Sequence, residues 1–122
     1  MRRFAEAKST RVVIAEEEGS LVGFVILNVE HDHHETVGYV VTLDVAPEQR
    51  RRGVAGSLMR EVERKAADEG CAAMVLHVFA GNDTATKFYA AMGYVRSQRV
   101  EGFYGPGLDA WLCHKPLRTA DC

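Results

Sequence analysis

Between a predicted strand and a predicted helix, the chain reads Gln49-Arg50-Arg51-Arg52-Gly53-Val54-Ala55-Gly56-Ser57. The first N–H groups of a helix have no partner within it, and the helix dipole is positive there, so this end attracts anions. Gly53 lets the backbone approach a ligand closely, and the arginines supply charge suited to phosphates. The stretch therefore predicts a pyrophosphate site. A solvated basic turn is the alternative, since neither GxxxxGKS/T nor GxGxxG is present.

The residues on either side of this turn predict a βαβ unit. Before it, residues 37–46 form a strand that Pro47 ends. After it, an apolar residue recurs every four positions, which indicates a helix over residues 54–69 that ends at Gly70. The recurring residues are Val54, Leu58, Val62 and Ala66. Residues 73–79 are a nearly continuous apolar run, as expected of a buried strand.

The rest of the chain adds elements on both sides of this unit. A turn at residues 18–20 joins two strands of a hairpin, and Asn82 or Asp83 caps a second helix. The added elements are strands over residues 11–15 and 21–29, a helix over 84–92, and strands over 94–101 and 109–115. The predicted order is β-β-β-α-β-α-β-β. The fold class is α/β (α+β): a mixed, mostly antiparallel central sheet with helices packed on it and a right-handed βαβ connection.

Composition limits the classes of function. The chain has 122 residues, 47% of them hydrophobic and 26% charged, which fits a single domain over residues 1–122. No apolar run could span a membrane, and a net charge of −2 gives no field for nucleic acid. The start lacks the apolar core of a signal peptide, and three widely spaced cysteines fit reduced thiols, so a cytoplasmic protein is expected. His31, His33 and His34 have no second ligand cluster, so no metal is expected.

Three motifs together carry a resemblance to a known family. The segment Arg50-Arg51-Arg52-Gly53-Val54-Ala55 resembles the acetyl-CoA signature of the GNAT superfamily of N-acetyltransferases. The segment Asn82-Asp83-Thr84-Ala85-Thr86-Lys87-Phe88-Tyr89, followed by Gly93-Tyr94, is similar to a second signature of that family. The ending, with Phe103-Tyr104, Asp109-Ala110 and Lys115-Pro116-Leu117, resembles N-terminal protein acetyltransferases, including the ribosomal-protein alanine type. The resemblance covers roughly residues 11–117.

The resemblance implies acetyl-CoA as the acyl donor and direct transfer of the acetyl group to an amine, without an acyl-enzyme. In the family, the pantetheine arm lies between two diverging strands, which here places backbone groups near Leu43 and Val45 against it. The cofactor-binding residues would be these two, Arg50 to Ser57, Asn82 and Tyr89. Tyr89 falls on the tyrosine that protonates the departing thiolate. A packing role for Tyr89 on the last helix is the alternative.

The resemblance also suggests residues for the acceptor side. His77 lies where N-terminal acetyltransferases place a base, and its ordinary pKa near 6.5 suits proton removal from an amine. Tyr39 could hold a water or the substrate amine, and Tyr104 could line the substrate mouth. The alternatives are a core histidine and a half-buried strand aromatic. Cys71 and Cys113 are expected to be packing residues, because no base partner can be named for either.

Several functional interpretations stay open. The leading one is acetylation of a protein or peptide α-amine; the others are acetylation of a small-molecule amine and a non-catalytic acyl-CoA-binding module. Typical members carry another strand and one or two helices before the first hairpin, whereas here Met1–Thr10 precede it, so N-terminal helices are expected to be reduced or absent. One wall of the acceptor site is then missing, supplied by a second subunit such as a homodimer partner, or part of a longer chain.

Overall fold

The computed structural model describes residues 2–6 (backbone only), 9–31, 34–50 and 53–117. The elements are β1 (Arg2–Glu6), β2 (Thr10–Glu17), β3 (Ser20–His31), β4 (Thr36–Val45), a 3₁₀ turn (Pro47–Gln49), α1 (Val54–Asp68), β5 (Ala73–Phe79), α2 (Asp83–Ala91), β6 (Val95–Val100) and β7 (Ala110–Pro116). All eight predicted elements form, most with bounds that differ by one or two residues. Helix α1 ends before Gly70, whose φ of +87° stops it as predicted.

One strand was not predicted. Strand β1 pairs antiparallel with β2, with Arg2 opposite Ile14 and Glu6 opposite Arg11. The predicted order β-β-β-α-β-α-β-β was therefore wrong at its start, where a fourth strand precedes the helix. The sequence Arg-Arg-Phe-Ala-Glu has no clear apolar alternation. A strand of this kind forms through backbone hydrogen bonds to an existing edge, which leave no mark in the sequence pattern.

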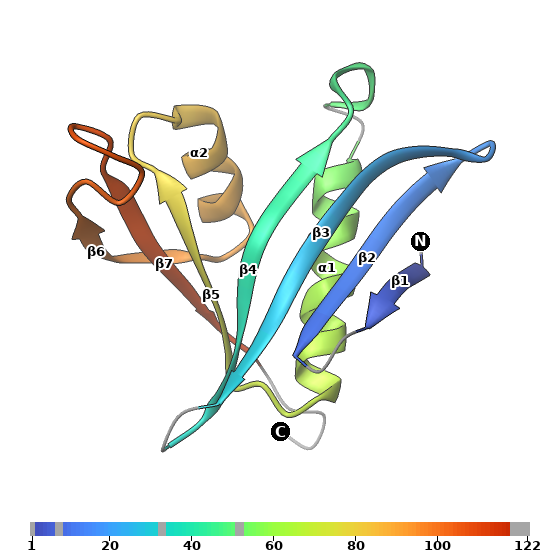
Figure 1. The fold of residues 1–122 in the computed structure, drawn as a ribbon, viewed down its shortest axis with the longest axis horizontal. Coiled ribbons are helices and arrows are strands. Elements are labelled where there is room, and N and C mark those ends of the chain that lie inside the picture. Colours follow the sequence, from blue (N-terminus) through green and yellow to red (C-terminus); the bar gives the residue numbers. More distant parts are fainter. Residues whose placement is uncertain (1, 7–8, 32–33, 51–52, 118–122) are drawn as a thin grey trace.

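The strands form one sheet in the order β1-β2-β3-β4-β5-β7-β6 (Figure 1). Of the described strand pairs, β4 with β5 is parallel and the others are antiparallel. Helix α1 connects these two parallel strands. The mixed, mostly antiparallel sheet with a βαβ unit is thus confirmed.

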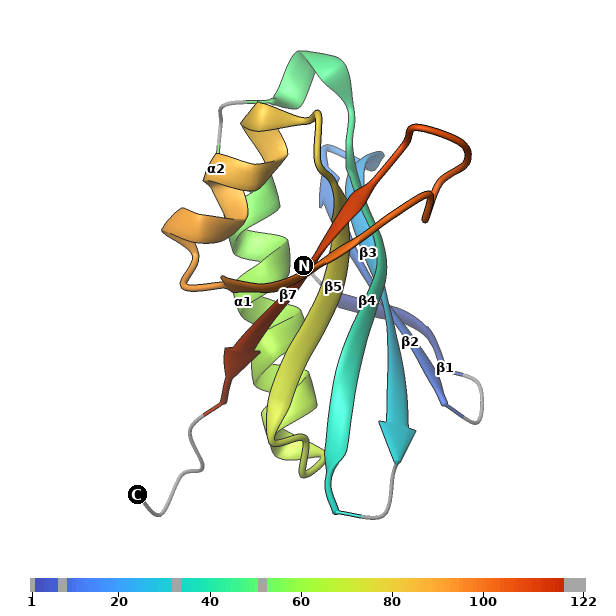
Figure 2. The ribbon, with the colours of Figure 1, turned by 90° about the vertical axis from the view of Figure 1, so that its left-hand side faces the viewer.

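Both helices lie on one face of the sheet (Figure 2). The apolar side of α1 packs on this face through side chains that are completely buried: Leu58, Met59, Val62 and Ala66. No described helix covers the other face, which we call the open face; the connection from β6 to β7 projects over it near the carboxyl end of β5 (Figure 2). None of the described helices is both long and apolar enough to cross a membrane.

Strands β4 and β5 pair over a short length and then separate (Figure 1). Their register runs from Val37 opposite Ala73 to Tyr39 opposite Val75. Beyond these residues β4 pairs only with β3, and β5 only with β7, within the described chain. The register of β4 against β3 also shifts just past Tyr39, which marks a bulge. We call the diverging parts of β4 and β5 the splay.

Candidate active site

The first part of the site is the beginning of α1. Gly53 is the N-cap residue, with a φ of +81° that side chains rarely adopt, and a Cβ there would meet no atom within 4 Å. The first intrahelical bond runs from the Ser57 N–H to the Gly53 carbonyl at 3.0 Å. The N–H groups of Val54, Ala55 and Gly56 are thus left for a ligand, and no acidic residue lies in this turn.

The arginine run adds charge at this end. The Arg50 Nε donates to the Val45 carbonyl at 3.3 Å, which fixes that side chain beside the last residue of β4. Arg51 and Arg52, which the sequence also predicts as cofactor-binding residues, lie outside the described residues. The described part of the turn has the open backbone and the charge that phosphates require.

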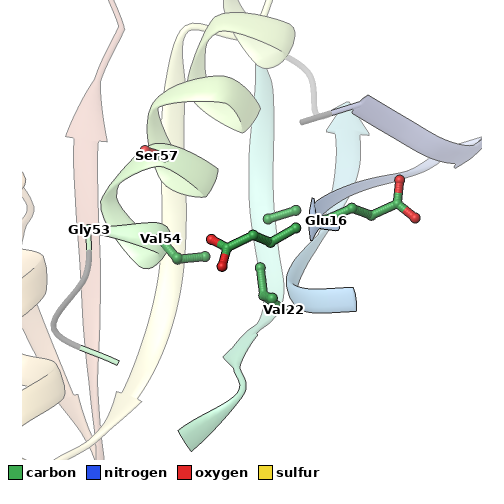
Figure 3. A pocket seen from close by; sticks show the side chains of 7 residues that line it. Glu16, Val22, Gly53, Val54 and Ser57 are labelled. Atoms are coloured by element: carbon green, nitrogen blue, oxygen red, sulfur yellow. The ribbon is translucent and has the colours of Figure 1, made fainter. Parts of the chain in front are cut away.

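A hollow of about 190 Å³ borders the same end of α1 (Figure 3). Gly53, Val54 and Ser57 of the helix face the end of the β2–β3 hairpin across it, including Glu16 and Val22. Glu17 also lines it, so two carboxylates border the space. Negative charge repels phosphate, so we do not assign the phosphate position to this hollow.

The second part is the edge of β4 in the splay. The Ala46 N–H donates to the Val22 carbonyl of β3 at 2.8 Å. Backbone groups of successive strand residues point to opposite edges, so Leu43 and Val45 direct theirs away from β3 and into the splay. Because the Val45 carbonyl already accepts from Arg50, the groups left for a ligand are those of Leu43 and the Val45 N–H.

The third part is α2, which lies beside β5 on the covered face. The Asn82 side-chain oxygen accepts from the Ala85 N–H at 3.0 Å, so it caps this helix. Of the two predicted cap residues, the structure thus confirms Asn82. Its contact with the cofactor stays a prediction.

Tyr89 lies on the side of α2 that packs on the core. Its ring meets those of Phe88 and Tyr94 edge to face, with centroids 5.1 and 5.7 Å away. Burial, with smaller effects from Tyr104 and Cys113, raises the pKa of Tyr89 to about 12. The phenol therefore stays protonated at neutral pH and can donate a hydrogen bond. The packing of Tyr89 is thus compatible with a donor role, and its predicted part in the reaction stays a prediction.

The fourth part lies on the open face, where the strands begin to diverge. The Tyr39 hydroxyl and the His77 Nδ1 are 2.6 Å apart, which joins β4 to β5 through side chains. Burial, together with Tyr104 and Glu30, raises the pKa of Tyr39, whereas burial lowers the pKa of His77. With the phenol protonated and the imidazole neutral, Tyr39 can donate to Nδ1, and the imidazole proton is then on Nε2. His77 is half-buried and hydrogen-bonded, and it borders the splay rather than the core.

The connection from β6 to β7 completes this side. The ring of Phe103 stacks on the His77 imidazole, with centroids 4.0 Å apart and planes 14° apart. The Tyr104 hydroxyl lies 3.4 Å from the His77 carbonyl, and its ring meets that of Phe79 edge to face. Tyr104 was predicted at the substrate mouth and lies beside His77. Phe103 was not predicted to contact the site; its signal was the aromatic pair Phe103-Tyr104 in an otherwise glycine-rich turn.

Other predicted candidates lie apart from this cluster. Cys71 and Cys113 are buried free thiols, and burial raises the pKa of both. These two thiols are in the core, which fits the predicted packing role. The His31 Nδ1 lies 2.8 Å from the Thr36 hydroxyl, and His33 falls outside the described residues. No cluster of metal-binding side chains occurs in the part of the chain that the structure describes.

Comparison with known proteins relates the chain to acetyltransferases. Residues 1–94 match the profile of the Acetyltransferase (GNAT) family. The chain is 29% identical over 99 residues to the N-alpha-acetyltransferase MAK3 of Arabidopsis thaliana, covering 80% of this chain and 52% of that protein. It is 32% identical over 102 residues to the N-terminal acetyltransferase B complex catalytic subunit naa20 of Schizosaccharomyces pombe, covering 80% and 57%. It is also 29% identical over 92 residues to the aminoglycoside N(6')-acetyltransferase type 1 of Salmonella typhimurium, covering 71% and 63%.

Solved structures show the same fold. Arabidopsis thaliana NAA60 in complex with acetyl-CoA is 25% identical, with a TM-score of 0.79 over 90% of this chain and 77% of that one. The ribosomal-protein-S18-alanine N-acetyltransferase from Escherichia coli has a TM-score of 0.81 at 20% identity, over 94% and 74%. The chain spans a little over half the length of the first two curated relatives.

Proposed function

Because the chain belongs to the acetyltransferase (GNAT) family, we propose that it is an acetyl-CoA-dependent N-acetyltransferase that acts on the α-amine of a peptide or protein. The observation that carries this proposal is the hydrogen bond between Tyr39 and His77 at the mouth of the splay. It supports a proton acceptor on the open face, opposite the face on which α2 lies with Tyr89. The space between the diverging strands would then have a hydrogen-bond donor, Tyr89, on one face and a proton acceptor, the Tyr39–His77 pair, on the other.

The described residues fit an acetyl-CoA molecule. The phosphates would bind the free N–H groups after Gly53, where the positive φ and the open space let a ligand reach the backbone. The pantetheine arm would form hydrogen bonds with the backbone groups of Leu43 and with the N–H of Val45 in the splay. When bound, acetyl-CoA supplies an acetyl thioester, and a backbone N–H in the splay would polarise its carbonyl oxygen.

The Tyr39–His77 pair would take the proton from the acceptor. At neutral pH an amine is an ammonium ion, which must lose a proton before it can attack. The His77 Nδ1 already accepts from Tyr39, so the ammonium proton goes to the Tyr39 oxygen while the phenol proton moves to Nδ1. This relay leaves Tyr39 neutral throughout and puts the positive charge on His77. His77 was predicted to be the base. The geometry favours Tyr39 as the group that contacts the amine, with His77 as the final proton acceptor.

Tyr89 would act at the other end of the reaction. The new bond joins the amine nitrogen to the acetyl carbon, the carbon–sulfur bond breaks, and the sulfur leaves as a thiolate that finally takes a proton. Because the pKa of Tyr89 is about 12, above the ordinary thiol value near 8.5, full proton transfer from this phenol is unfavourable. Tyr89 would therefore stabilise the thiolate chiefly as a hydrogen-bond donor, a role its hydroxyl can take because no described residue bonds to it.

The mouth favours a peptide over a polycationic amine. Exposed rings of Phe79, Phe103 and Tyr104 surround His77 and offer apolar and peptide-like contacts. Of the described residues, Glu30 is the carboxylate whose charge acts on Tyr39. An aminoglycoside carries several ammonium groups and needs several acidic partners. The similarity to an aminoglycoside acetyltransferase keeps that substrate as the second candidate.

The first experiment measures thermal unfolding with and without acetyl-CoA. A ligand at about 100 times its dissociation constant adds about 2.7 kcal/mol to the free energy of unfolding, so a clear rise in Tm is expected. No rise at millimolar acetyl-CoA would contradict the binding site at α1 and the splay.

The second experiment identifies the acceptor through thiol release from acetyl-CoA. We expect turnover with a peptide that has a free α-amine, and none with the same peptide blocked at that amine but carrying a lysine. Turnover with an aminoglycoside alone would replace the peptide by the second candidate. Binding of acetyl-CoA without transfer to any amine would indicate a non-catalytic module.

A further inference from the structure

Phe103 is half exposed, with 43% of its surface accessible, and it belongs to the connection from β6 to β7, which projects over the open face (Figure 2). Exposure alone carries no inference, because single apolar side chains are common at protein surfaces. The closest described ring contact of Phe103 is the His77 imidazole, on which it stacks at 4.0 Å with nearly parallel planes. The observation that matters is therefore this stacking, which brings Phe103 against a residue of the candidate site.

The imidazole needs such a neighbour to fix its plane. The last side-chain torsion of histidine is broad, so a strand backbone alone does not hold the ring at one angle. The 2.6 Å contact with Tyr39 fixes one atom, Nδ1, but the ring can still tilt about that point. A stacked aromatic ring restricts that tilt and keeps water from one face of the imidazole.

The turn that carries Phe103 is itself held in place. The Asp109 carboxylate accepts from the Gly102 N–H at 2.9 Å and from the Arg99 Nε at 3.0 Å. The Tyr104 N–H donates to the Leu108 carbonyl at 3.0 Å, which closes the turn from inside. Because these hydrogen bonds fix the turn, the ring of Phe103 has a defined position and can restrict the movement of the His77 imidazole.

From this geometry we infer that Phe103 is a positioning residue, whose ring holds the His77 imidazole in the plane that gives Nδ1 to Tyr39. The inference rests on the proposed function, since it supplies the reason for a fixed imidazole. The titratable groups in contact with His77 are Tyr39 from β4 and Tyr104 from the turn. On β7, His114 lies opposite Val75, two residues before His77 in β5. None of these groups is a carboxylate. We therefore expect Phe103 to affect the pKa of His77 mainly by limiting the exposure of the imidazole to water.

The test is NMR spectroscopy of the imidazole nitrogens in the ligand-free protein, with His77 assigned by the signals lost in His77→Gln. In the wild type we expect one tautomer, with the proton on Nε2. In Phe103→Ala we expect mixed tautomers and a His77 pKa that rises toward 6.5, because burial lowers it in the wild type. Phe103→Tyr keeps a ring and should restore the wild-type signals. Unchanged His77 signals in Phe103→Ala would overturn the inference.

Leu108→Ala is the matched control, because Leu108 lies in the same turn with the same 43% exposure and is not in ring contact with His77. It should leave the imidazole signals unchanged; an equal effect would mean that the turn as a whole matters, not the Phe103 ring. A kinetic measurement adds a second readout: kcat should fall about tenfold in Phe103→Ala and recover in Phe103→Tyr, with the KM for acetyl-CoA unchanged. If the wild type transfers no acetyl group, the proposed function fails while the NMR result still decides the role of Phe103.

Discussion

The two sides of the splay are built in different ways. The part of the cofactor side proposed for the phosphates is local in the sequence: its described residues, Arg50 and Gly53 to Ser57, lie within one stretch, and its N–H donors are backbone groups at the beginning of α1. The acceptor side is assembled from three separate parts of the chain: Tyr39 on β4, His77 on β5, and Phe103 and Tyr104 in the turn before β7. A local feature can be broken by one backbone change, whereas an assembled one depends on every strand that positions it.

The largest effect is expected from Gly53→Glu. The carboxylate would repel phosphates at the helix end, and the positive φ adds strain of about 1–3 kcal/mol. Calorimetry should show no binding of CoA by a folded protein. Gly70→Glu is the control, since Gly70 has a similar φ of +87° and open space at the opposite end of the same helix. If Gly53→Glu bound CoA normally, the backbone cradle would be wrong.

The acceptor side should be most sensitive to Tyr39→Phe, which removes the hydroxyl that contacts the His77 Nδ1. General base catalysis contributes about 10²- to 10⁴-fold, so kcat should fall by at least 100-fold. Binding of acetyl-CoA, followed by calorimetry, should be unchanged. A loss that appeared only in the KM for acetyl-CoA would instead place Tyr39 on the cofactor side.

Tyr89→Phe should have a smaller effect on kcat, roughly 10- to 100-fold, because the phenol acts as a hydrogen-bond donor rather than a full acid. Its affinity for acetyl-CoA should be retained, since the ring still packs against Phe88 and Tyr94. Full activity of this variant would show that Tyr89 only packs.

The pH dependence should follow His77. The base must be neutral, and burial lowers the pKa of His77 below its ordinary value of 6.5. The rate should therefore be level through neutral pH and fall about tenfold per unit once the pH drops below that lowered pKa. Measured kcat/KM that began to fall well above pH 6.5 would point to another group.

The smallest effect on catalysis is expected from a change in the interior, which supports the cofactor side and the acceptor side alike. The Tyr94 hydroxyl donates to the buried Glu63 at 2.8 Å, and Lys115 donates to the same carboxylate at 2.9 Å, which ties α1 to β7. Tyr94→Phe should lower the free energy of unfolding by about 2 kcal/mol, the usual value for a hydrogen bond to a charged group. Denaturant unfolding measures this loss. A variant with normal stability but little activity would show that this tie serves catalysis instead.

Most of the fold could be predicted because its signals are local. The four-residue spacing of Val54, Leu58, Val62 and Ala66 specifies the buried side of α1, and all but Val54 are fully buried. Strand β1 could not be predicted, since it depends on the free edge of β2. The cap of α2 could be predicted from Asn82-Asp83, since a side-chain acceptor before a helix is a local signal, and Asn82 is the residue that provides it.

The sequence by itself determined the strand, the turn at Gly53 and the helix that follows, and hence an anion-binding end. These follow from apolar periodicity, glycine and the helix dipole, which act over a few residues. Only the tertiary structure decided the partner of His77. Tyr39 is 38 residues away along the chain, and the two meet because parallel pairing of β4 with β5 stops at Tyr39 and Val75. Strand register depends on the packing of the whole sheet, so no local pattern specifies it.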